Sequence, residues 1–372
     1  MTVICWFRRV LRLDDHPALV ASEGVGAVIP LVILDPAEAR AHPASAQRQA
    51  MSLPLLDASL RRQGSRLIVR RGDPAAVIEA IVRETGARRI DATAGFPFAS
   101  DAGLVQAAER GGARLVMHHQ ADLVPRGAVR TGQDGAYKVF TPFWRALRAH
   151  PVAPPLDAPR LTPPATWPAS DGADWPEARL AMRHGWDVVA RHVEAGEDAA
   201  RDRLRAFLDG PVGTYREQRD LPWRAGTSGL SDALAVGEIS ARRIWHLCQA
   251  AWHEGRQGTE DFLRELGWRE FARDLFHDDP RMDRDCWRRE WNGFPWKPGN
   301  DQAENWRRAR TGIPIVDAGL RELFVTGRMH NRVRMIAASY LTKHLLTDWR
   351  VGLDWFAQTL TRIMHEELVR LA

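Results

Sequence analysis

A proline-rich stretch divides this sequence into two parts with different periodicities. Eight prolines lie between Pro151 and Pro176, and residues that lack a backbone donor at this density exclude a regular helix or strand. We therefore predict an extended linker over residues 146–185, with one domain before it (1–145) and a second after it (186–372). The length of 372 residues also exceeds the roughly 100–200 residues typical of one domain.

Residues 1–120 alternate short β-branched runs with helical patterns. This alternation predicts βαβ units and an α/β domain with a doubly wound parallel sheet. The expected strands are Val3–Phe7, Val28–Leu34, Leu67–Arg70, Arg89–Thr93 and Arg114–His118, with helices at 46–62 and 74–85. No G-x-G-x-x-G follows the first strand, so nothing indicates a nicotinamide-binding fold.

Helical periodicity dominates the sequence beyond about residue 185 and predicts an all-α domain. Pro314 suits the first turn of a helix, Gly327 suits its C-terminal exit, and Asn331 opens the next periodic run. The expected helices are 198–208, 241–253, 259–277, 314–325, 329–346 and 353–371.

Several classes of protein and site are excluded by what the sequence lacks. No window approaches the ~18 consecutive apolar residues of a membrane span, and the N-terminus has no signal-peptide pattern. Three widely spaced cysteines fit neither a disulfide framework nor a metal site. No metal cluster, Ser-His-Asp arrangement or phosphate-binding loop is visible. We therefore expect a cytoplasmic protein without membrane association, and a monomer.

Charge and aromatic residues concentrate in the second half. Residues 321–350 carry six arginines and lysines against two acidic residues, which suits a polyanion. Ten of the 15 tryptophans lie at or after Trp223, many beside arginine, and such pairs can stack on bases or flavins while the arginines meet phosphate. The alternatives are a solvated helix face for the charges and core packing for the tryptophans.

Helical spacing brings two sets of polar residues together. Glu265, Trp268 and Arg269 stand at i, i+3 and i+4 and share one face, which offers a carboxylate, a stacking plane and a cation. Asn331, Arg334 and Met335 repeat this spacing. A buried arginine beside an amide is costly unless it faces an anion or a polar ligand. A structural salt-bridge network is the alternative interpretation.

Longer motifs follow one another in a family-specific order. They are Trp6-Phe7-Arg8-Arg9 with 11–15, Tyr137–Trp144, Tyr215–Asp220 followed by Thr227–Ser231, Glu265–Phe271, and Met329–Met335. In these motifs the sequence resembles the DNA photolyase/cryptochrome family, and most of all its cyclobutane pyrimidine dimer photolyases. The resemblance covers essentially the whole chain. It implies an α/β antenna-type domain followed by an all-α FAD-binding domain.

The resemblance also implies roles for individual residues. FAD would be held by a group of residues from the second domain, namely Tyr215, Thr227, Ser228, Gly229, Leu230, Ser231, Phe262, Arg334 and Met335. Glu265, Trp268 and Asn331 would contact the dimer, and Arg219 and Arg269 would lie near DNA. Trp296 and Trp349 would be the outer and middle members of the tryptophan chain that photoreduces the flavin. A second, antenna chromophore of folate or deazaflavin type is implied, but residues 95–98 do not resemble the usual folate-contacting stretch.

The implied function is light-dependent repair of cyclobutane pyrimidine dimers in DNA by electron transfer from reduced FAD. The dimer must leave the duplex to reach a buried flavin. Two alternatives remain: a cryptochrome-like blue-light photoreceptor, and an inactive, truncated remnant that binds flavin poorly. In the family's pattern an Asp-x-Asp pair, an asparagine near flavin N5 and a proximal tryptophan follow, and Arg362 and Met364 stand at the aspartate positions. We therefore expect an incomplete FAD-binding domain with weak flavin binding.

Two smaller departures from the family pattern lie in the first motif, at 6–15, and directly after Thr227–Ser231. Val10 stands where an acidic residue is usual, and Asp232 replaces the usual proline after Ser231. Both are interpreted as tolerable substitutions.

Overall fold

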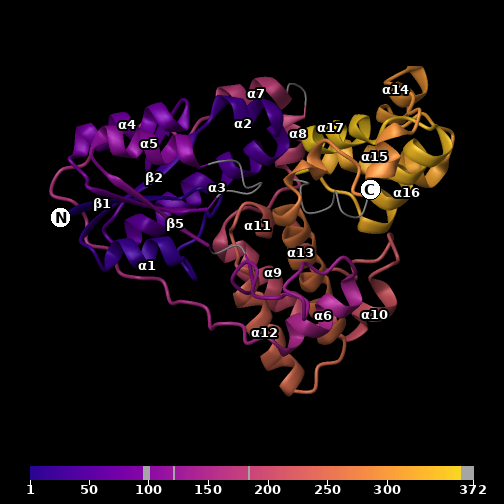
Figure 1. The fold of residues 1–372 in the computed structure, drawn as a ribbon, viewed down its shortest axis with the longest axis horizontal. Helices are drawn as coiled ribbons and strands as arrows, with labels where there is room; N and C mark the ends of the chain where they lie inside the picture. Colours follow the sequence, from indigo (N-terminus) through magenta and orange to yellow (C-terminus); the bar gives the residue numbers. More distant parts are fainter. Residues whose placement is uncertain (95–100, 120–121, 183–184, 362–372) are drawn as a thin grey trace.

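The computed structural model describes residues 1–94, 101–119, 122–182 and 185–361 (Figure 1). Its first part contains a parallel sheet of five strands in the order β3-β2-β1-β4-β5. The strands are β1 (Thr2–Trp6), β2 (Ala27–Leu34), β3 (Ile68–Arg71), β4 (Arg89–Thr93) and β5 (Arg114–His118). The predicted doubly wound α/β domain is therefore confirmed, with each strand within one residue of its expected bounds.

Helices cover both faces of this sheet, as Figure 1 shows. Alternate residues of β1 point to opposite sides: Val3 packs in the core beneath α1 and α3, and Ile4 in the core beneath α4 and α5. Because both faces are buried, the two central strands β1 and β2 are almost entirely apolar. The helices are α1 (Pro17–Glu23), α2 (Pro36–Ala41), α3 (Pro43–Arg62), α4 (Pro74–Thr85) and α5 (Ala102–Gly111).

The proline-rich segment runs from the helical half back along the α/β domain (Figure 1). Backbone bonds hold it there, including Val28 N–H to the Thr162 carbonyl at 2.9 Å and Asp171 N–H to the Val69 carbonyl at 2.8 Å. The predicted linker 146–185 also contains the end of α6 (Phe140–Ala149) and all of α7 (Pro176–Met182). Helix α6 packs in the core of the helical half, so that core draws on residues before the expected boundary.

No strand follows β5 in the described part of the chain, apart from one isolated bridge between Lys297 and Thr347, and the residues after the proline-rich segment form helices and their connections. The predicted all-α character of the second part is confirmed. The elements are α8 (Trp186–Ala190), α9 (Glu197–Asp209), η1 (Pro211–Thr214), α10 (Tyr215–Gln218), α11 (Ser231–Ala235), α12 (Ala241–His253), α13 (Thr259–Asp278), η2 (Pro280–Asp283), η3 (Arg289–Gly293), α14 (Asp301–Arg307), α15 (Pro314–Thr326), α16 (Asn331–Ser339), η4 (Tyr340–His344) and α17 (Trp349–Thr359).

These helices form two cores rather than one. The first packs α6, α9, α12 and α13 together, and the second packs α14, α15, α16 and α17. Figure 1 shows the second group beside the first, with α10 and α11 near their junction. The division leaves room for a cavity between the two groups.

Two helix predictions need correction. The expected helix 329–346 begins at Asn331, because the His330 side chain caps it, and it gives way after Ser339 to the π-helical turn η4. The expected helix 353–371 begins earlier, at Trp349, where the Asp348 carboxylate accepts from the Arg350 N–H. Such side-chain caps, rather than apolar periodicity, set where these helices begin. Residues beyond 361 lie outside the described part.

Buried ion pairs join the two domains at two places. In the first, the carboxylates of the opening motif accept from α12: Arg243 Nη2 lies 2.6 Å from Asp14, and Arg242 Nε lies 3.2 Å from Asp15. Arg12 adds hydrogen bonds to the carbonyls of Asp14, Asp15 and Gly237. The opening motif therefore serves as a clamp between the domains.

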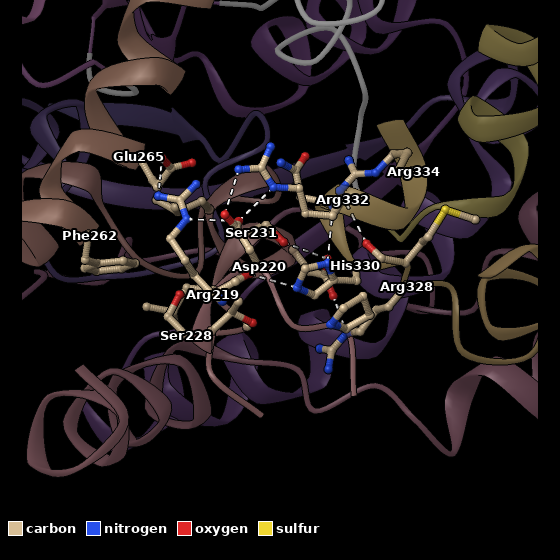
Figure 2. A pocket seen from close by; sticks show the side chains of 18 of the residues that line it. Arg219, Asp220, Ser228, Ser231, Phe262, Glu265, Arg328, His330, Arg332 and Arg334 are labelled. Atoms are coloured by element: carbon tan, nitrogen blue, oxygen red, sulfur yellow. Dashed lines mark hydrogen bonds and ion pairs between the residues drawn. The ribbon is translucent and has the colours of Figure 1, made fainter. Parts of the chain in front are cut away.

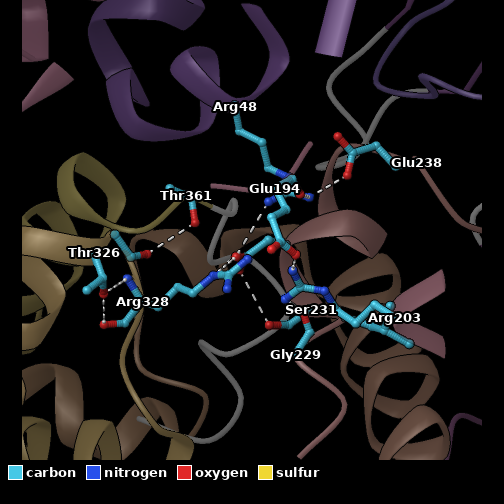
Figure 3. Close-up of polar contacts among 12 residues, drawn as sticks. Arg48, Glu194, Arg203, Gly229, Ser231, Glu238, Thr326, Arg328 and Thr361 are labelled. Carbon is cyan, nitrogen blue, oxygen red and sulfur yellow. Dashed lines mark hydrogen bonds and ion pairs between the residues drawn. The ribbon is translucent and has the colours of Figure 1, made fainter. Parts of the chain in front are cut away.

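The second junction is centred on Arg48 of α3, whose side chain is almost fully buried. Its guanidinium pairs with Glu238 and lies 3.7 Å from Asp232, both in the helical half (Figure 3). The Glu238 carboxylate also accepts from Ser52 Oγ at 2.5 Å and from Gly196 N–H at 2.7 Å. Arg48, Ser52 and Gly196 thus hold this carboxylate together.

Removing the Glu238 carboxylate should destabilise the protein strongly. In Glu238→Ala the Arg48 guanidinium stays buried without its principal partner, which typically costs about 3–5 kcal/mol in the free energy of unfolding. Urea denaturation measures the loss. Asp198→Ala is the control, because the Asp198–Arg62 pair is mostly exposed and should contribute little. Equal stability of the two variants would contradict the assigned importance of this junction.

Candidate functional site

A cavity of about 590 Å³ lies between the two helical cores. Its walls come from α10, the turn that precedes α11, one face of α13, and the segment that leads into α16. Figure 2 shows side chains from these segments converging on it, including Phe262, Ser231 and Arg334. The volume falls within the ~300–1,000 Å³ typical of sites for small molecules and cofactors.

Most of the predicted site residues line this single cavity. They are Tyr215, Arg219, Thr227, Ser228, Gly229, Leu230, Ser231, Phe262, Glu265, Trp268, Arg269, Asn331 and Arg334. Three others do not line it in the described part of the chain: Met335, which is exposed on α16, and the tryptophans Trp296 and Trp349. The proposed contact of Met335 with flavin therefore stays a prediction without support from its position.

The carboxylate of Glu265 is tied to Arg219 across the cavity wall. Arg219 Nη1 lies 2.6 Å from Glu265 Oε1 (Figure 2). The guanidinium also lies over the Tyr215 ring, 5.4 Å from its centroid. We expected Glu265 to contact the lesion and Arg219 to act separately on DNA. Since the two groups form one ion pair, a change at either residue alters both.

His330 links the same wall to α16. Its Nδ1 accepts from the Arg332 N–H at 3.2 Å, and its Nε2 lies 3.0 Å from the Arg219 carbonyl oxygen. An Nδ1 that accepts carries no proton, so the ring is neutral and Nε2 donates. Burial and the nearby guanidinium groups lower the pKa of His330 below its usual value.

The turn at 227–231 and the residue before it require glycine at two positions of the backbone. Gly229 adopts a left-handed φ of 62°, and a side chain on Gly226 would meet Gln218 Cβ at 2.7 Å. The Ser228 hydroxyl accepts from the Leu230 N–H at 3.4 Å, and Arg203 donates to the Gly229 carbonyl at 3.4 Å. The turn thus brings three hydroxyl-bearing residues, Thr227, Ser228 and Ser231, to the cavity.

The side chain of Asp232 is buried and forms ion pairs at the wall of the cavity. The sequence alone indicated only a tolerable substitution at this position. Arg328 Nε lies 2.6 Å from its carboxylate and Arg48 approaches from the other domain at 3.7 Å (Figure 3). No local motif connects residues 48, 232 and 328, so the sequence could not reveal this cluster. It ties the cavity wall to the interdomain junction.

Three of the six cationic residues in 321–350 form ion pairs, two of them with acidic residues elsewhere in the chain. Arg332 makes two hydrogen bonds of 2.8 Å to Asp220, and Arg328 and Arg350 pair with Asp232 and Asp348. The attraction of residues 321–350 for a polyanion is therefore weaker than their composition suggested. The cavity lining nevertheless contains six arginines and four acidic residues, which favours an anionic ligand.

Trp268 lies against a residue of the 137–144 motif. Its ring stacks on Phe140 with centroids 3.7 Å apart and planes 10° apart. The neighbouring Gly267 is required by the same packing, since a side chain there would lie 2.4 Å from the Trp144 ring. The two motifs thus form one packing unit, in which α6 supports the stacking surface of the cavity.

Three further predicted residues, Arg269, Trp296 and Trp349, are partly or fully buried. Arg269 is largely buried and donates to Glu270 at 3.0 Å, so its predicted contact with DNA stays a prediction. Trp349 is buried at the first helical core, with the partly buried Trp296 packed at that core. Burial of a redox-active ring shields it from water, but neither ring borders the cavity.

Comparisons with known proteins agree with this architecture. Residues 3–162 match the DNA photolyase family and residues 262–363 match the FAD binding domain of DNA photolyase. A deoxyribodipyrimidine photo-lyase of Agrobacterium fabrum is 38% identical over 370 residues, which cover 96% of this chain and 76% of that protein. The chain belongs to the DNA photolyase/cryptochrome family.

Solved structures of the family share the whole described fold. A class III photolyase from Agrobacterium tumefaciens superposes with a TM-score of 0.90 at 34% identity, covering 100% of this chain and 78% of that one. A cryptochrome from Synechocystis superposes with a TM-score of 0.89 at 27% identity, covering 99% and 81%. A photolyase FAD-binding domain is therefore present in this chain.

Other classes of site are not found. Within the described residues, no group of three or more His, Cys, Asp or Glu side chains could hold a metal ion. None of the described helices is long and apolar enough to span a membrane.

The stability of this photolyase-type site should fall in mild acid because of His330. A pKa that folding lowers contributes stability above about pH 6.5, and this contribution is lost as the pH falls below that value. In His330→Asn the oxygen still caps α16 but does not titrate. The melting temperature of the native protein should therefore fall more steeply between pH 7 and 5 than that of the variant. His253→Asn, at the exposed C-terminal end of α12, is the control, and parallel profiles for all three proteins would refute the role of His330.

Proposed function

We propose that this protein repairs cyclobutane pyrimidine dimers in DNA in a light-dependent reaction with FAD. One observation carries the proposal: the residues expected to hold flavin and those expected to contact the lesion line the same cavity. A reaction between a bound cofactor and a pyrimidine dimer extruded from the duplex requires the cofactor-binding and dimer-binding residues to line one cavity.

The residues that would hold FAD fit it in kind. The Tyr215 and Phe262 rings, 5.5 Å apart, offer apolar surface, and the hydroxyls of Thr227, Ser228 and Ser231 suit an anionic diphosphate. The buried Arg334, which donates to the Met329 carbonyl at 3.3 Å, brings positive charge to the same cavity. When bound and reduced, FAD would supply the light-excited electron donor.

The protein's own groups would bind, orient and polarise. Asn331 lies half-buried at the start of α16 and would hydrogen-bond the polar edge of the dimer. Glu265 would accept from the lesion, held in place by Arg219. Trp268, backed by Phe140, would present its other face as a stacking surface. Trp296 and Trp349 would pass electrons toward the flavin from the protein surface.

A photoreceptor role is the second candidate, and the similarity to the Synechocystis cryptochrome supports it. The two roles differ in one measurable property. A photoreceptor would change the redox state of its flavin in blue light without restoring dimers, whereas a lyase would restore them. The identity of an antenna chromophore also stays open, because residues 95–98 lie outside the described part.

The expected weakness of flavin binding remains a separate prediction, since Arg362 and Met364 lie outside the described residues. We expect the purified chain to carry less than one FAD per protein. Flavin absorbance after gel filtration measures the ratio. A stoichiometric amount of FAD that reduces readily in blue light with a thiol would contradict the expectation.

Repair itself should depend on Asn331. With reduced FAD in excess and blue light, the native chain should restore a thymine dimer in an oligonucleotide, measured as the recovery of base absorbance. Asn331→Ala should weaken dimer binding by about 5-fold or more, the effect of losing roughly 1 kcal/mol of hydrogen bonding, and leave flavin content unchanged. Ile336→Ala, exposed on the same helix, is the control. Flavin photoreduction without repair by the native chain would favour the photoreceptor.

A further inference from the structure

A turn at the mouth of the cavity carries the most exposed tryptophan of the described residues. The side chain of Trp223 is 75% exposed, compared with 47% for Trp252 and 46% for Trp291. Single exposed apolar side chains are ordinary on protein surfaces, so exposure alone identifies nothing. The surroundings of Trp223 distinguish it from the other two.

Trp223 stands on a fixed backbone. The Leu221 N–H bonds to the Gln218 carbonyl and the Arg224 N–H bonds to the Leu221 carbonyl, both at 3.0 Å, so residues 221–224 form a closed turn. Pro222 occupies its second position, where the ring presets the backbone angle. Trp223 is thus held out into solvent by a turn that has little freedom to fold it inward.

The base of the turn is anchored to α16. Arg332 makes two hydrogen bonds of 2.8 Å to Asp220, and His330 Nε2 donates to the Arg219 carbonyl at 3.0 Å. These bonds fix the position of the turn relative to Asn331, the residue proposed to contact the lesion.

The residues on either side of Trp223 belong to the cavity. Pro222 and Arg224 both line it, so the indole stands at its rim. Arg224 is exposed, and across the described ranges it forms no ion pair, unlike Arg219 and Arg332, which pair with Glu265 and Asp220. The rim therefore presents a rigid aromatic plane next to a guanidinium that has no acidic partner in the described chain.

These features match the chemistry of a nucleic acid strand beside an extruded nucleotide. Bases that lose a stacked neighbour expose an apolar face, which an aromatic side chain can cover, and the adjacent phosphate takes an arginine. A rigid indole loses little conformational freedom on contact. Resting on the function proposed above, we infer that turn 221–224 is a DNA-contacting element. Trp223 stacks on a base beside the extruded dimer and Arg224 binds the backbone.

The two roles predict different signatures in DNA-binding titrations over a range of salt concentrations. Trp223→Ala should weaken binding of a dimer-containing duplex by about 5- to 150-fold, the equivalent of the ~1–3 kcal/mol of one stacked base, without changing the salt dependence. Trp223→Phe should retain part of the affinity. Arg224→Gln should weaken dimer-containing and undamaged duplexes alike and lower the salt slope by about 1.

Matched controls separate the turn from general surface effects. Trp252→Ala removes another exposed indole and Arg88→Gln another exposed arginine, on the α/β domain, and neither should change binding. A 2-aminopurine placed next to the dimer should be less fluorescent with the native protein than with Trp223→Ala, because stacking quenches it.

If Trp223→Ala and Arg224→Gln both bind DNA with the affinity and salt slope of the native protein, the inference is overturned. A turn that binds a protein partner instead of DNA would give this result. Equal affinity of the native chain for damaged and undamaged duplexes would contradict the proposed repair function. In that case the salt slope of Arg224→Gln still decides whether the turn contacts DNA.

Discussion

The buried charge cluster around Arg48 ties the walls of the cavity to the α/β domain, because its members come from three separate parts of the chain. Arg48 comes from the α/β domain, Glu238 and Asp232 from the helical half, and Arg328 from the segment that leads into α16. A buried ion is tolerated only with its partners in place. The domains can therefore adopt few relative positions without leaving a charge unsatisfied, and the cavity acquires a defined shape.

Packing between α6 and α13 supplies the second constraint. Gly267 lets the Trp144 ring approach the helix backbone, and Phe140 stacks flat on Trp268. Because α6 precedes the proline-rich segment and α13 follows it, this contact closes a long loop of chain. The extended segment bridges that distance, and its backbone bonds to the α/β domain explain why it needs neither helix nor strand to be ordered.

The sequence predicted the elements well where periodicity decides, as in α4 and α12, whose bounds match residue by residue. It also brought together the cavity residues on α13, because helical spacing alone places Glu265 and Trp268 on one face. It indicated Asn331 as the opening of α16, but it could not predict the start of α17, which depends on the Asp348 cap. It also could not predict ion pairs between distant residues. Asp232 and Arg328 are 96 positions apart, and no local pattern relates them.

Ion pairs between distant residues also reduce the electrostatic attraction to DNA that the arginine-rich composition would suggest. Arg219 and Arg332 already hold carboxylates, so a phosphate that reaches them must displace Glu265 or Asp220, and the exchange gains less than a contact with a solvated arginine. Counterions released on binding scale with the phosphates newly neutralised, so the number of arginines overstates the electrostatic attraction. Under the proposed repair function, specificity would then come chiefly from shape and stacking inside the cavity. A site that recognises an extruded dimer needs this balance, because strong attraction to every phosphate would hold the protein on undamaged DNA.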